Sequence, residues 1–513
     1  MNSRDAQDAV LAFLADPATH GGAAVKRIDT HAAVIFLAGT RAFKVKREVR
    51  FPFLDYSNLE KRKAACDSEL RINQPLAAQI YRRVVPITRA ADGGLRIGGD
   101  GAPIEWAVEM HRFDDTATLD RLAQAGRIDA TLADAMGRAV ARMHADAPAV
   151  EPSRWINALA GYIEEHAEAF AALPELFPGH EVEALAGASR AEYARVHSLL
   201  VERGRRGFIR RIHGDLHLGN IVLIDGHPVL FDAVEFSELI ASGDLLYDLA
   251  FLLMDLTERG LRPAANVVLN RYLTETRRSE DLDALAALPL FLSMRAAIRA
   301  KVAAARLAFV VPQEKPAVEA SARQYFSFAR RFITPGRPML LAVGGLSGTG
   351  KSVLARMLAA ELEPAPGAVV LRSDIERKTL FGKSEAEKLP NDAYTPAVTA
   401  RVFATLADKA RRVLAAGHSA IVDAVFSRPQ EREIMEQSAS LVGVPLRALF
   451  LQADLATRTT RVGERGLDAS DADAAVVRKQ ESYDLGPLTW RRLDGSGTPE
   501  ETLGRARALL RGD

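Results

Sequence analysis

The chain has 513 residues, of which 48% are hydrophobic and 26% are charged, and this size and apolar content predict two or three domains with substantial cores. Lys and Arg total 67 against 66 Asp and Glu, which gives a formal net charge of +1. This balance argues against an acidic disordered chain and against general electrostatic capture of nucleic acid or of an anionic membrane. The single cysteine, Cys66, excludes a disulfide framework and any cysteine-based zinc site.

The N-terminal segment 1–16 does not resemble a signal peptide, because it carries Asp5 and Asp8 and has no long apolar core. No apolar run in the sequence reaches the roughly 18 residues that a membrane span requires. Together with the single cysteine, these features predict a soluble protein of a reducing, cytoplasmic compartment that has no membrane partner.

The first part of the chain predicts strands followed by long helical stretches. A helix is expected over 57–79, with Ser57 as its N-cap and Glu60 three residues later. Helical periodicity also fills 119–201 and 245–332. Apolar alternation bounded by turn residues predicts hairpins over 24–50 and strands over 84–88, 95–97, 104–113, 221–224 and 229–231.

The clearest linker signal is the Pro- and Gly-rich segment 334–338. Beyond it the pattern changes to strand, Gly-rich turn, helix, strand and helix, which is typical of a parallel α/β sheet. We therefore expect two domains, 1–333 and 338–513. Because each is large enough to fold alone, cutting the chain near Gly336 is expected to give two folded pieces.

A phosphate-binding loop is predicted at 345–352, which fits G-x-x-x-x-G-K-[ST] between an apolar strand and a helix. Glycines let backbone N–H groups close around phosphate oxygens, and the helix N-terminus adds its positive dipole end. Lys351 should reach the β and γ phosphates and the Ser352 hydroxyl should bind Mg²⁺, the alternative being a coincidental glycine-rich turn. The nucleotide-binding residues expected here are Gly345, Ser347, Gly348, Thr349, Gly350, Lys351 and Ser352.

Two carboxylates follow the next two predicted strands. Asp374 comes after the apolar stretch 368–371, at a strand tip that faces the ligand crevice, where it could accept a proton from a substrate hydroxyl. Arg377 could hold the acceptor or its phosphate, and the plainer alternative for Asp374 is a helix N-cap. Asp423 ends the strand 419–422, where a carboxylate that orients Mg²⁺ belongs.

Three arginines follow the predicted strand 448–451. Arg461 and Arg465 are four residues apart and would share one face of a helix, and Arg458 precedes them. Phosphoryl transfer develops charge on the equatorial oxygens, which an arginine lid would stabilise. The alternative is a solvated basic helix face.

From residue 338 onward, these motifs resemble the P-loop kinases of small metabolites and nucleic-acid ends, the gluconate kinase and polynucleotide kinase group. The phosphate loop carries most of the resemblance, and the carboxylates and arginines just described add to it. The resemblance implies Mg-ATP binding and phosphoryl transfer to a hydroxyl, without identifying that hydroxyl.

The segment from His213 to Asn220 reads H-G-D-L-x-x-x-N, with Asp215 and Asn220 five residues apart. In phosphotransfer to an alcohol, such an Asp accepts the hydroxyl proton and the Asn binds Mg²⁺. Asp232 lies where the second metal-binding carboxylate of the kinase fold is found, although the usual Phe-Gly after it is missing. The alternative is a histidine-rich turn or a metal pair at His213 and His217.

The segment 42–44, Ala-Phe-Lys, resembles the A-[IF]-K of the third kinase strand, whose Lys pairs the α and β phosphates and a helix Glu. Glu69 is the candidate partner of Lys44. Lys46 shares the same strand face because side chains alternate, so it stays an alternative, with Lys44 favoured by the Ala two residues before it. The adenine is expected to bond backbone groups near 109–113.

Residues 25–330 resemble the aminoglycoside phosphotransferase family through the H-G-D-x-x-x-x-N loop, Asp232 and the G-D-x-x-x-D-L-A pattern at 243–250. The resemblance implies that Asp244 and Asp248 brace the catalytic loop rather than touch substrate. The G-x-G-x-x-G and A-P-E motifs of protein kinases are missing, which favours a small-molecule kinase. The order of the two halves matches a family of bacterial two-domain proteins.

These patterns predict an α+β, bilobal, kinase-like domain followed by an α/β P-loop domain with a parallel sheet. The predicted function is ATP- and Mg²⁺-dependent phosphotransfer by two modules, each acting on a hydroxyl of a small molecule, and nucleic acid is not expected as a partner. Two other hypotheses stay open: a nucleotide-gated regulatory or stress-response ATPase, and a polynucleotide end kinase with an accessory kinase-like domain.

Overall fold

The computed structural model describes residues 3–51, 54–464 and 469–511. Their contacts group the chain into two units, Met1–Ala158 with Leu200–Leu252, and Leu159–Leu199 with Leu253–Asp513. This grouping reflects packing contacts and does not test whether the pieces on either side of the linker 334–338 fold independently. The division at that linker therefore remains a prediction. Within the described part of the chain, no helix is both long enough and apolar enough to cross a membrane.

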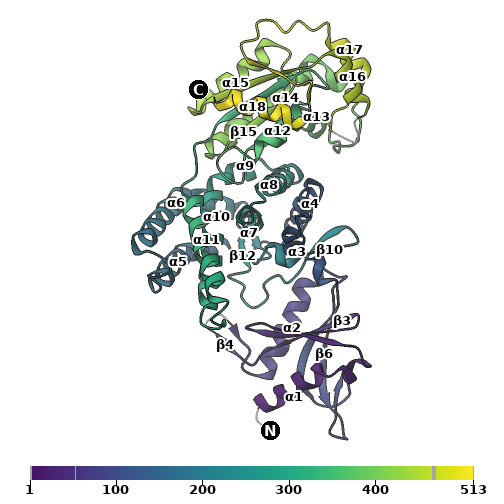
Figure 1. Ribbon diagram of the computed structural model, residues 1–513, viewed down its shortest axis with the longest axis vertical. Coiled ribbons are helices and arrows are strands. Elements are labelled where there is room, and N and C mark those ends of the chain that lie inside the picture. Colours follow the sequence, from purple (N-terminus) through teal and green to yellow (C-terminus); the bar gives the residue numbers. More distant parts are fainter. Residues whose placement is uncertain (1–2, 52–53, 465–468, 512–513) are drawn as a thin grey trace. The chain divides into compact units, whose positions relative to one another are not determined.

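The first unit is built on an antiparallel sheet of six strands in the order β1-β2-β3-β8-β6-β7 (Figure 1). Side chains alternate between its two faces, so Phe43 and Val45 pack with the apolar side of α1, while Ala42 joins the core with Cys66 of α2. The elements are α1 (Ser3–Ala15), β1 (Val25–Asp29), β2 (Ala33–Ala38), β3 (Arg41–Lys46), α2 (Leu59–Asn73), β6 (Tyr81–Arg89), β7 (Leu95–Ile97) and β8 (Pro103–His111), with a small hairpin of β4 (Arg50–Phe51) and β5 (Leu54–Asp55).

Helix α2 is shorter than the predicted helix 57–79. Its N-cap is Asn58, whose side chain accepts the N–H of Lys61 at 2.9 Å. Ser57, the expected cap, instead donates its hydroxyl to Asp55 at 2.6 Å. The helix ends at Asn73, two residues before Pro75, because proline has no N–H to continue the helical hydrogen bonds. The prediction was therefore wrong at both ends of this helix.

The rest of the first unit places the loop 213–220. Two short strand pairs flank it, β9 with β12 and β10 with β11, of which only the second pair was predicted. Asp244 ends β12, forms a buried ion pair with Arg203, Oδ2 to Nε 2.6 Å, and accepts the N–H of Leu246 at 2.8 Å, which fixes the start of α7. These elements are α3 (Leu119–Gln124), α4 (Ala130–Asp146), β9 (Ile209–Arg211), β10 (Ile221–Ile224), β11 (His227–Leu230) and β12 (Ser242–Asp244). Three further helices belong partly to each unit: α5 (Pro152–Ala171), α6 (Gly179–Arg205) and α7 (Leu245–Glu258).

The second unit contains helices and a five-stranded sheet in the order β14-β15-β13-β16-β17, with all neighbours parallel, which confirms the predicted sheet. Asp423 pairs in register with Val343 of β13 and with Arg372 of β14, so the strand ends that carry the predicted site meet at one edge. The elements are α8 (Arg262–Thr276), α9 (Ser279–Asp283), α10 (Leu288–Arg306), α11 (Lys315–Ile333), β13 (Leu340–Gly345), α12 (Lys351–Ala359), β14 (Val369–Arg372), α13 (Ser373–Leu380), α14 (Pro396–Ala415), β15 (Ala420–Asp423), α15 (Pro429–Val442), β16 (Leu446–Gln452), α16 (Leu455–Gly463), α17 (Ala474–Gln480), β17 (Arg491–Asp494) and α18 (Pro499–Arg511).

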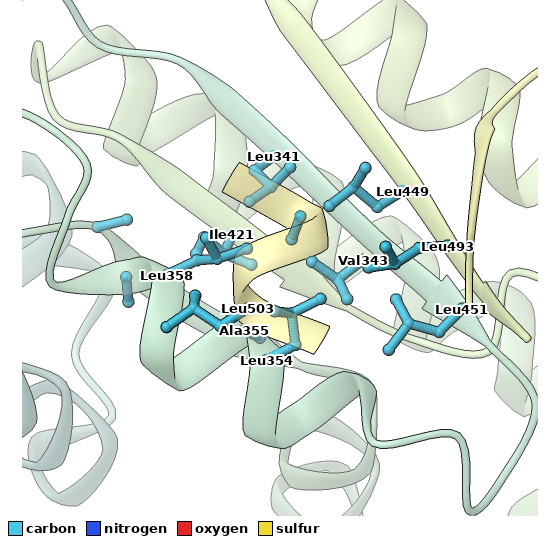
Figure 2. Close-up of a cluster of buried hydrophobic side chains, with 13 residues drawn as sticks. Leu341, Val343, Leu354, Ala355, Leu358, Ile421, Leu449, Leu451, Leu493 and Leu503 are labelled. Atoms are coloured by element: carbon cyan, nitrogen blue, oxygen red, sulfur yellow. The ribbon is translucent and has the colours of Figure 1, made fainter. Parts of the chain in front are cut away.

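The core of this sheet lies between its strands and the helices α12 and α18. Figure 2 shows that β13, β15, β16 and β17 each contribute buried aliphatic side chains to one cluster. Burying each such side chain is worth roughly 1.5–3 kcal/mol, so the cluster anchors β13 and α12, the two elements that flank the phosphate loop. Its labelled members are Leu341, Val343, Leu354, Ala355, Leu358, Ile421, Leu449, Leu451, Leu493 and Leu503.

Two buried imidazoles of the second unit predict a loss of stability in acid. Burial lowers the pKa of His166 to about 3 and that of His418 to about 4, whereas histidine in an unfolded chain titrates near ~6.5. Below that pH the unfolded chain binds protons that the native state does not, so the stability present at pH 7 is lost progressively as the pH falls. At a pH of about 5 we expect a loss of about 2 kcal/mol for each histidine.

Urea unfolding measured near neutrality and near pH 5 checks this expectation. His418→Gln removes one of these titrations, so it should reduce the loss of stability between the two pH values by about 2 kcal/mol. A free energy of unfolding that is the same at both pH values would contradict it.

Candidate functional site

Two lysines of β3 share one buried glutamate of α2. Lys44 Nζ lies 2.8 Å from Glu69 Oε1, and Lys46 Nζ lies 2.5 Å from Glu69 Oε2. Burial alone would raise the pKa of Glu69, but the two ammonium groups outweigh it and hold the pKa at about 2. The carboxylate is therefore ionised, and it contacts both lysines that the sequence left as alternatives.

A second carboxylate distinguishes the two lysines. Lys44 Nζ also lies 2.7 Å from Asp232 Oδ1, whereas Lys46 binds Glu235. The side chains of Lys44 and Asp232 are 12% and 42% exposed, against 3% and 7% for Lys46 and Glu235. Burial opposes the charge of Lys44, but Asp232 and Glu69 raise its pKa well above the ordinary value. Lys44 is thus the ammonium beside an accessible carboxylate, and Lys46 joins α2 to the segment after Asp232.

Asp232 has a left-handed backbone, with φ of 61°, a conformation that Asp and Asn adopt more readily than most residues. Its N–H donates to the Tyr81 hydroxyl at 3.3 Å, and Asn73 accepts the N–H of Ala233 at 2.7 Å and donates to its carbonyl at 3.1 Å. The sequence did not reveal these roles of Asn73 and Tyr81. The available signal for Asn73 was its position four residues after Glu69, which puts both on one helix face.

The loop that begins at His213 is braced by α7. The buried carboxylate of Asp248 accepts the N–H groups of His213 at 2.9 Å and Gly214 at 3.0 Å. The same carboxylate lies 3.2 Å from Nε2 of the buried His144. Asp248 therefore has the bracing position that the family resemblance implied, and His144 is a supporting residue that the sequence did not reveal.

His213 also connects the loop to the strand end before Asp232. Its Nε2 donates to the carbonyl of Phe231 at 3.0 Å, and the Phe231 N–H donates to the carbonyl of Asn220 at 3.0 Å. Burial lowers the pKa of His213, so the imidazole stays neutral and its Nδ1 can accept the N–H of Asp215 at 3.4 Å. The ring is therefore engaged at both nitrogens in holding the loop, which disfavours the metal-pair alternative.

Asp215 and Asn220 face each other across this loop. Asn220 Nδ2 donates to Asp215 Oδ2 at 3.0 Å and to its carbonyl at 2.9 Å. His217 Nε2 lies 3.4 Å from the same carboxylate oxygen, while its Nδ1 accepts the N–H of Gly219 at 3.0 Å. The Asp215 side chain is nevertheless 44% exposed, so a buried scaffold presents an accessible carboxylate, which is what a general base for an outside hydroxyl needs.

The segment predicted to bind adenine is partly committed to the fold. The N–H of His111 donates to Ile80 O at 2.7 Å, and that of Arg112 donates to Thr40 O at 2.9 Å. The side chain of Glu109 is buried among three arginines, Arg41, Arg82 and Arg83. An adenine at 109–113 would therefore have to use other backbone groups of the segment.

In the second unit, the predicted phosphate loop joins β13 to α12, which begins at Lys351 after Gly350, with φ of 89°. Gly348 has φ of 84°, and a Cβ there would lie 2.5 Å from the carbonyl oxygen of Arg458. Only glycine fits so close to another backbone. The loop thus has the tight turn and the helix N-terminus that a chain of phosphates requires.

Ser347 of this loop is clamped by residues from α16 and α17. Gln480 accepts the Ser347 N–H at 2.7 Å and donates to its Oγ at 3.0 Å. The buried Arg458 donates from Nε to Ser347 O at 2.9 Å and pairs with Glu481. Arg458 therefore supports the loop instead of forming part of a lid. Gln480 was missed, because its contact joins residues 133 positions apart.

Asp423 ends β15 and Asp374 follows the end of β14, so both lie at the sheet edge where the phosphate loop leaves β13. Among the described residues, the buried Oδ1 of Asp423 has no hydrogen-bond partner, and its Oδ2 lies 3.4 Å from Arg372 Nε. A buried carboxylate oxygen without a donor suits a cation. Asp374 is the second residue of α13, whose N-cap is Arg372, so the N-cap alternative for Asp374 does not hold.

Two predicted arginines are already engaged with the fold. Arg377 donates to Ala393 O at 2.7 Å and to Thr399 Oγ1 at 3.3 Å. Its Nε has no hydrogen-bond partner among the described residues, so an acceptor contact by Arg377 would have to use the N–H groups that these two bonds leave over. Arg461 donates to the carbonyls of residues 495, 496 and 497 at 2.6, 3.0 and 2.7 Å, and its Nη1 would lie 3.8 Å from a Cβ on Gly350. Arg461 thus anchors the β17–α18 loop beside the phosphate loop, and Arg465 lies outside the described residues.

Comparison with known proteins assigns the two halves to two families. Residues 36–288 match the model of the phosphotransferase enzyme family, and residues 340–484 match that of an AAA domain. Uncharacterized proteins of Mycobacterium tuberculosis and Mycobacterium bovis are each 30% identical over 495 residues, which is 94% of this chain and 95% of theirs. A choline/ethanolamine kinase family protein from Mesorhizobium loti is similar over 63% of this chain and 99% of its own, with 14% identity and a TM-score of 0.38. A gluconokinase from Sinorhizobium meliloti is similar over 34% and 91%, with 21% identity and a TM-score of 0.25.

Proposed function

The chain belongs to the family of two-domain proteins in which a phosphotransferase-family domain precedes a P-loop domain, and we propose that each module transfers a phosphoryl group from ATP to a hydroxyl of a small molecule. The observation that carries the proposal is the set of contacts in the first unit. Lys44 pairs with Asp232, and His213 ties the strand end before Asp232 to the loop of Asp215 and Asn220. Kinases of the protein-kinase class use these residue types to align the nucleotide, to bind Mg²⁺ and to accept the proton of an alcohol.

In the first module, Asp215 would accept the proton of the acceptor hydroxyl, since its carboxylate is accessible while its backbone is fixed. Asn220 and Asp232 would hold Mg²⁺, because the Asn220 amide donates its N–H groups to Asp215 and leaves its oxygen as the cation ligand. Mg²⁺, when bound, neutralises the charge that develops on the transferred group. Lys44 would pair with phosphate oxygens while Glu69 keeps its ammonium in place.

In the second module, the backbone of 345–352 and Lys351 would hold the phosphates at the N-terminus of α12. Ser352 and Asp423 would hold the cation, a role supported by the Asp423 oxygen that has no donor among the described residues. Asp374, at the start of α13, would accept the proton of the second acceptor.

A phosphorylation screen tests the proposal. A metabolite library that includes an oligonucleotide with a 5′-hydroxyl is incubated with labelled ATP and one of three full-length proteins. These are the parent, the Asp215→Asn variant and the Lys351→Ala variant. We expect at least one small hydroxyl compound to be labelled by the parent, and each product to be lost in only one of the two variants.

Three other outcomes would contradict the proposal. ATP turnover that is equally fast with and without every library pool would indicate a regulatory ATPase. Labelling confined to the oligonucleotide would indicate an end kinase. Loss of the same product in both variants would show that the modules do not act separately.

A further inference from the structure

Helix α8 satisfies two outward-facing backbone groups at the start of the edge strand β14. The N–H of Val369 points into the sheet, where it donates to Ser419 O at 2.9 Å, so the N–H of Val370 points away from it. Asn270 accepts that N–H at 2.7 Å. Asn266 and Asn270 also donate to Ala368 O at 3.0 and 3.1 Å. Two asparagines one helical turn apart thus take the place of a neighbouring strand.

The same helix also holds the chain that follows α13. Arg271 Nη1 lies 2.5 Å from Glu385 Oε1, and its Nη2 lies 3.3 Å from Glu385 Oε2. The backbone carbonyl of Glu385 in turn accepts a bond from Lys378 of α13 at 2.6 Å. Helix α8 therefore contacts the strand before α13 and, through Glu385, the last turn of α13 itself.

We propose that α8 is a positioning element of the P-loop module: Asn266, Asn270 and Arg271 hold β14 and α13, and so place Asp374 beside the phosphate loop. All these residues belong to the second unit. Yet α8 lies inside the 36–288 match to the phosphotransferase family, whereas β14 and α13 lie inside the 340–484 match to the AAA domain. A helix within the phosphotransferase-family match thus covers the edge strand of the sheet within the AAA-domain match, on the side of the sheet where Asp374 lies. The inference rests on the proposed function only for the role of Asp374.

This arrangement separates the placement of Asp374 from nucleotide binding in the P-loop module. The phosphate loop follows β13, the central strand, which pairs with β15 and β16 and not with β14. Helix α8 also contacts α12, and its bond there, from Arg262 Nη2 to Leu362 O at 2.8 Å, lies past the C-terminal end of α12, opposite the phosphate loop. Loosening α8 should therefore free β14 and α13 and leave nucleotide binding by the loop intact. If α8 served only as general support, loosening it would affect both the order of β14 and α13 and the affinity of the loop for the nucleotide.

Hydrogen–deuterium exchange of the full chain tests this separation. Asn266→Ala/Asn270→Ala is compared with Asn157→Ala, which alters an exposed residue of α5. In the double variant, peptides that span Val370 and α13 should exchange at least about tenfold faster, while Asn157→Ala should match the parent. A second variant, Arg271→Ala, should accelerate exchange only around 378–385.

Binding of Mg-ATP is measured on the same variants in an Asp232→Asn background, which silences the first site. The affinity should stay within about twofold of that background. Unchanged exchange at Val370 in the double variant would overturn the proposal. Loss of ATP affinity together with faster exchange in β13 and β16 would also overturn it, because it would show general unfolding. If the Asp232→Asn background bound no ATP, the proposed function would fail, whereas the exchange data would still decide the role of α8.

Discussion

Asp215→Asn is expected to lower phosphoryl transfer by the first module about 10²–10⁴-fold, the usual contribution of a general base, while ATP binding stays intact. Asparagine keeps the size of the side chain and an oxygen for the Asn220 amide, which lies 3.0 Å from Asp215 Oδ2. It removes the negative charge and, with it, the ability to take up a proton. Calorimetry measures ATP binding in a Lys351→Ala background, and the acceptor found in the screen reports transfer.

Asp232→Asn is the matched comparison, and it should lose both Mg²⁺-dependent ATP binding and transfer. Asparagine tolerates the left-handed φ of 61° at this position, so the backbone should be preserved while the metal ligand and the partner of Lys44 are weakened. If ATP binding collapsed in Asp215→Asn but survived in Asp232→Asn, the two roles would be interchanged. If neither variant changed binding or transfer, the first module would be a kinase-like binding module.

Lys351→Ala should weaken Mg-ATP binding by the second module about 10–100-fold. The change removes a charged donor from phosphates that lie in a partly buried site, where a hydrogen bond to a charged group is worth roughly 1.5–3 kcal/mol. The affinity is measured in the full chain with the first site silenced by Asp232→Asn.

Lys479→Ala provides the control for lost charge, since Lys479 is an exposed lysine of α17. It should leave the ATP affinity of the second module unchanged. An unchanged affinity in Lys351→Ala would mean that the glycine-rich turn does not bind the nucleotide.

The parts of the site that the sequence predicts well are those fixed by local geometry. The phosphate loop needs a strand, glycines with positive φ and a helix start, all within one short segment, and Gly348 and Gly350 have that backbone. Asp423 was likewise expected at a strand tip, because parallel strands end at a common edge. Local rules also placed Lys44 on a strand face toward a helix glutamate.

The residues that the sequence does not reveal act over long distances along the chain. Gln480 binds Ser347 across 133 positions, and Asn73 binds Ala233 across 160. No periodicity marks such pairs, since each partner looks like an ordinary helix or loop residue on its own. The start of α2 was missed for a different reason: Ser57 and Asn58 are both good caps, and only the contact between Ser57 and Asp55 decides between them.

We predicted that cutting the chain near Gly336 gives two pieces that fold independently. That outcome depends on contacts that the sequence did not show. The linker composition correctly marks the change from helices to the parallel sheet. However, Asn266 and Asn270 bond the edge strand β14 from a helix well before that linker. Exposing a strand edge invites pairing with other chains, so a C-terminal piece would lose a natural cover of its sheet.

The most direct test of two separate nucleotide sites is the stoichiometry of Mg-ATP binding to the full chain by calorimetry. We expect two ATP molecules for each parent chain. With ATP at concentrations that fill only the unweakened sites, we expect one for Lys351→Ala, one for Asp232→Asn and none for the double variant. A single site in the parent chain, or two sites remaining in Lys351→Ala, would contradict it.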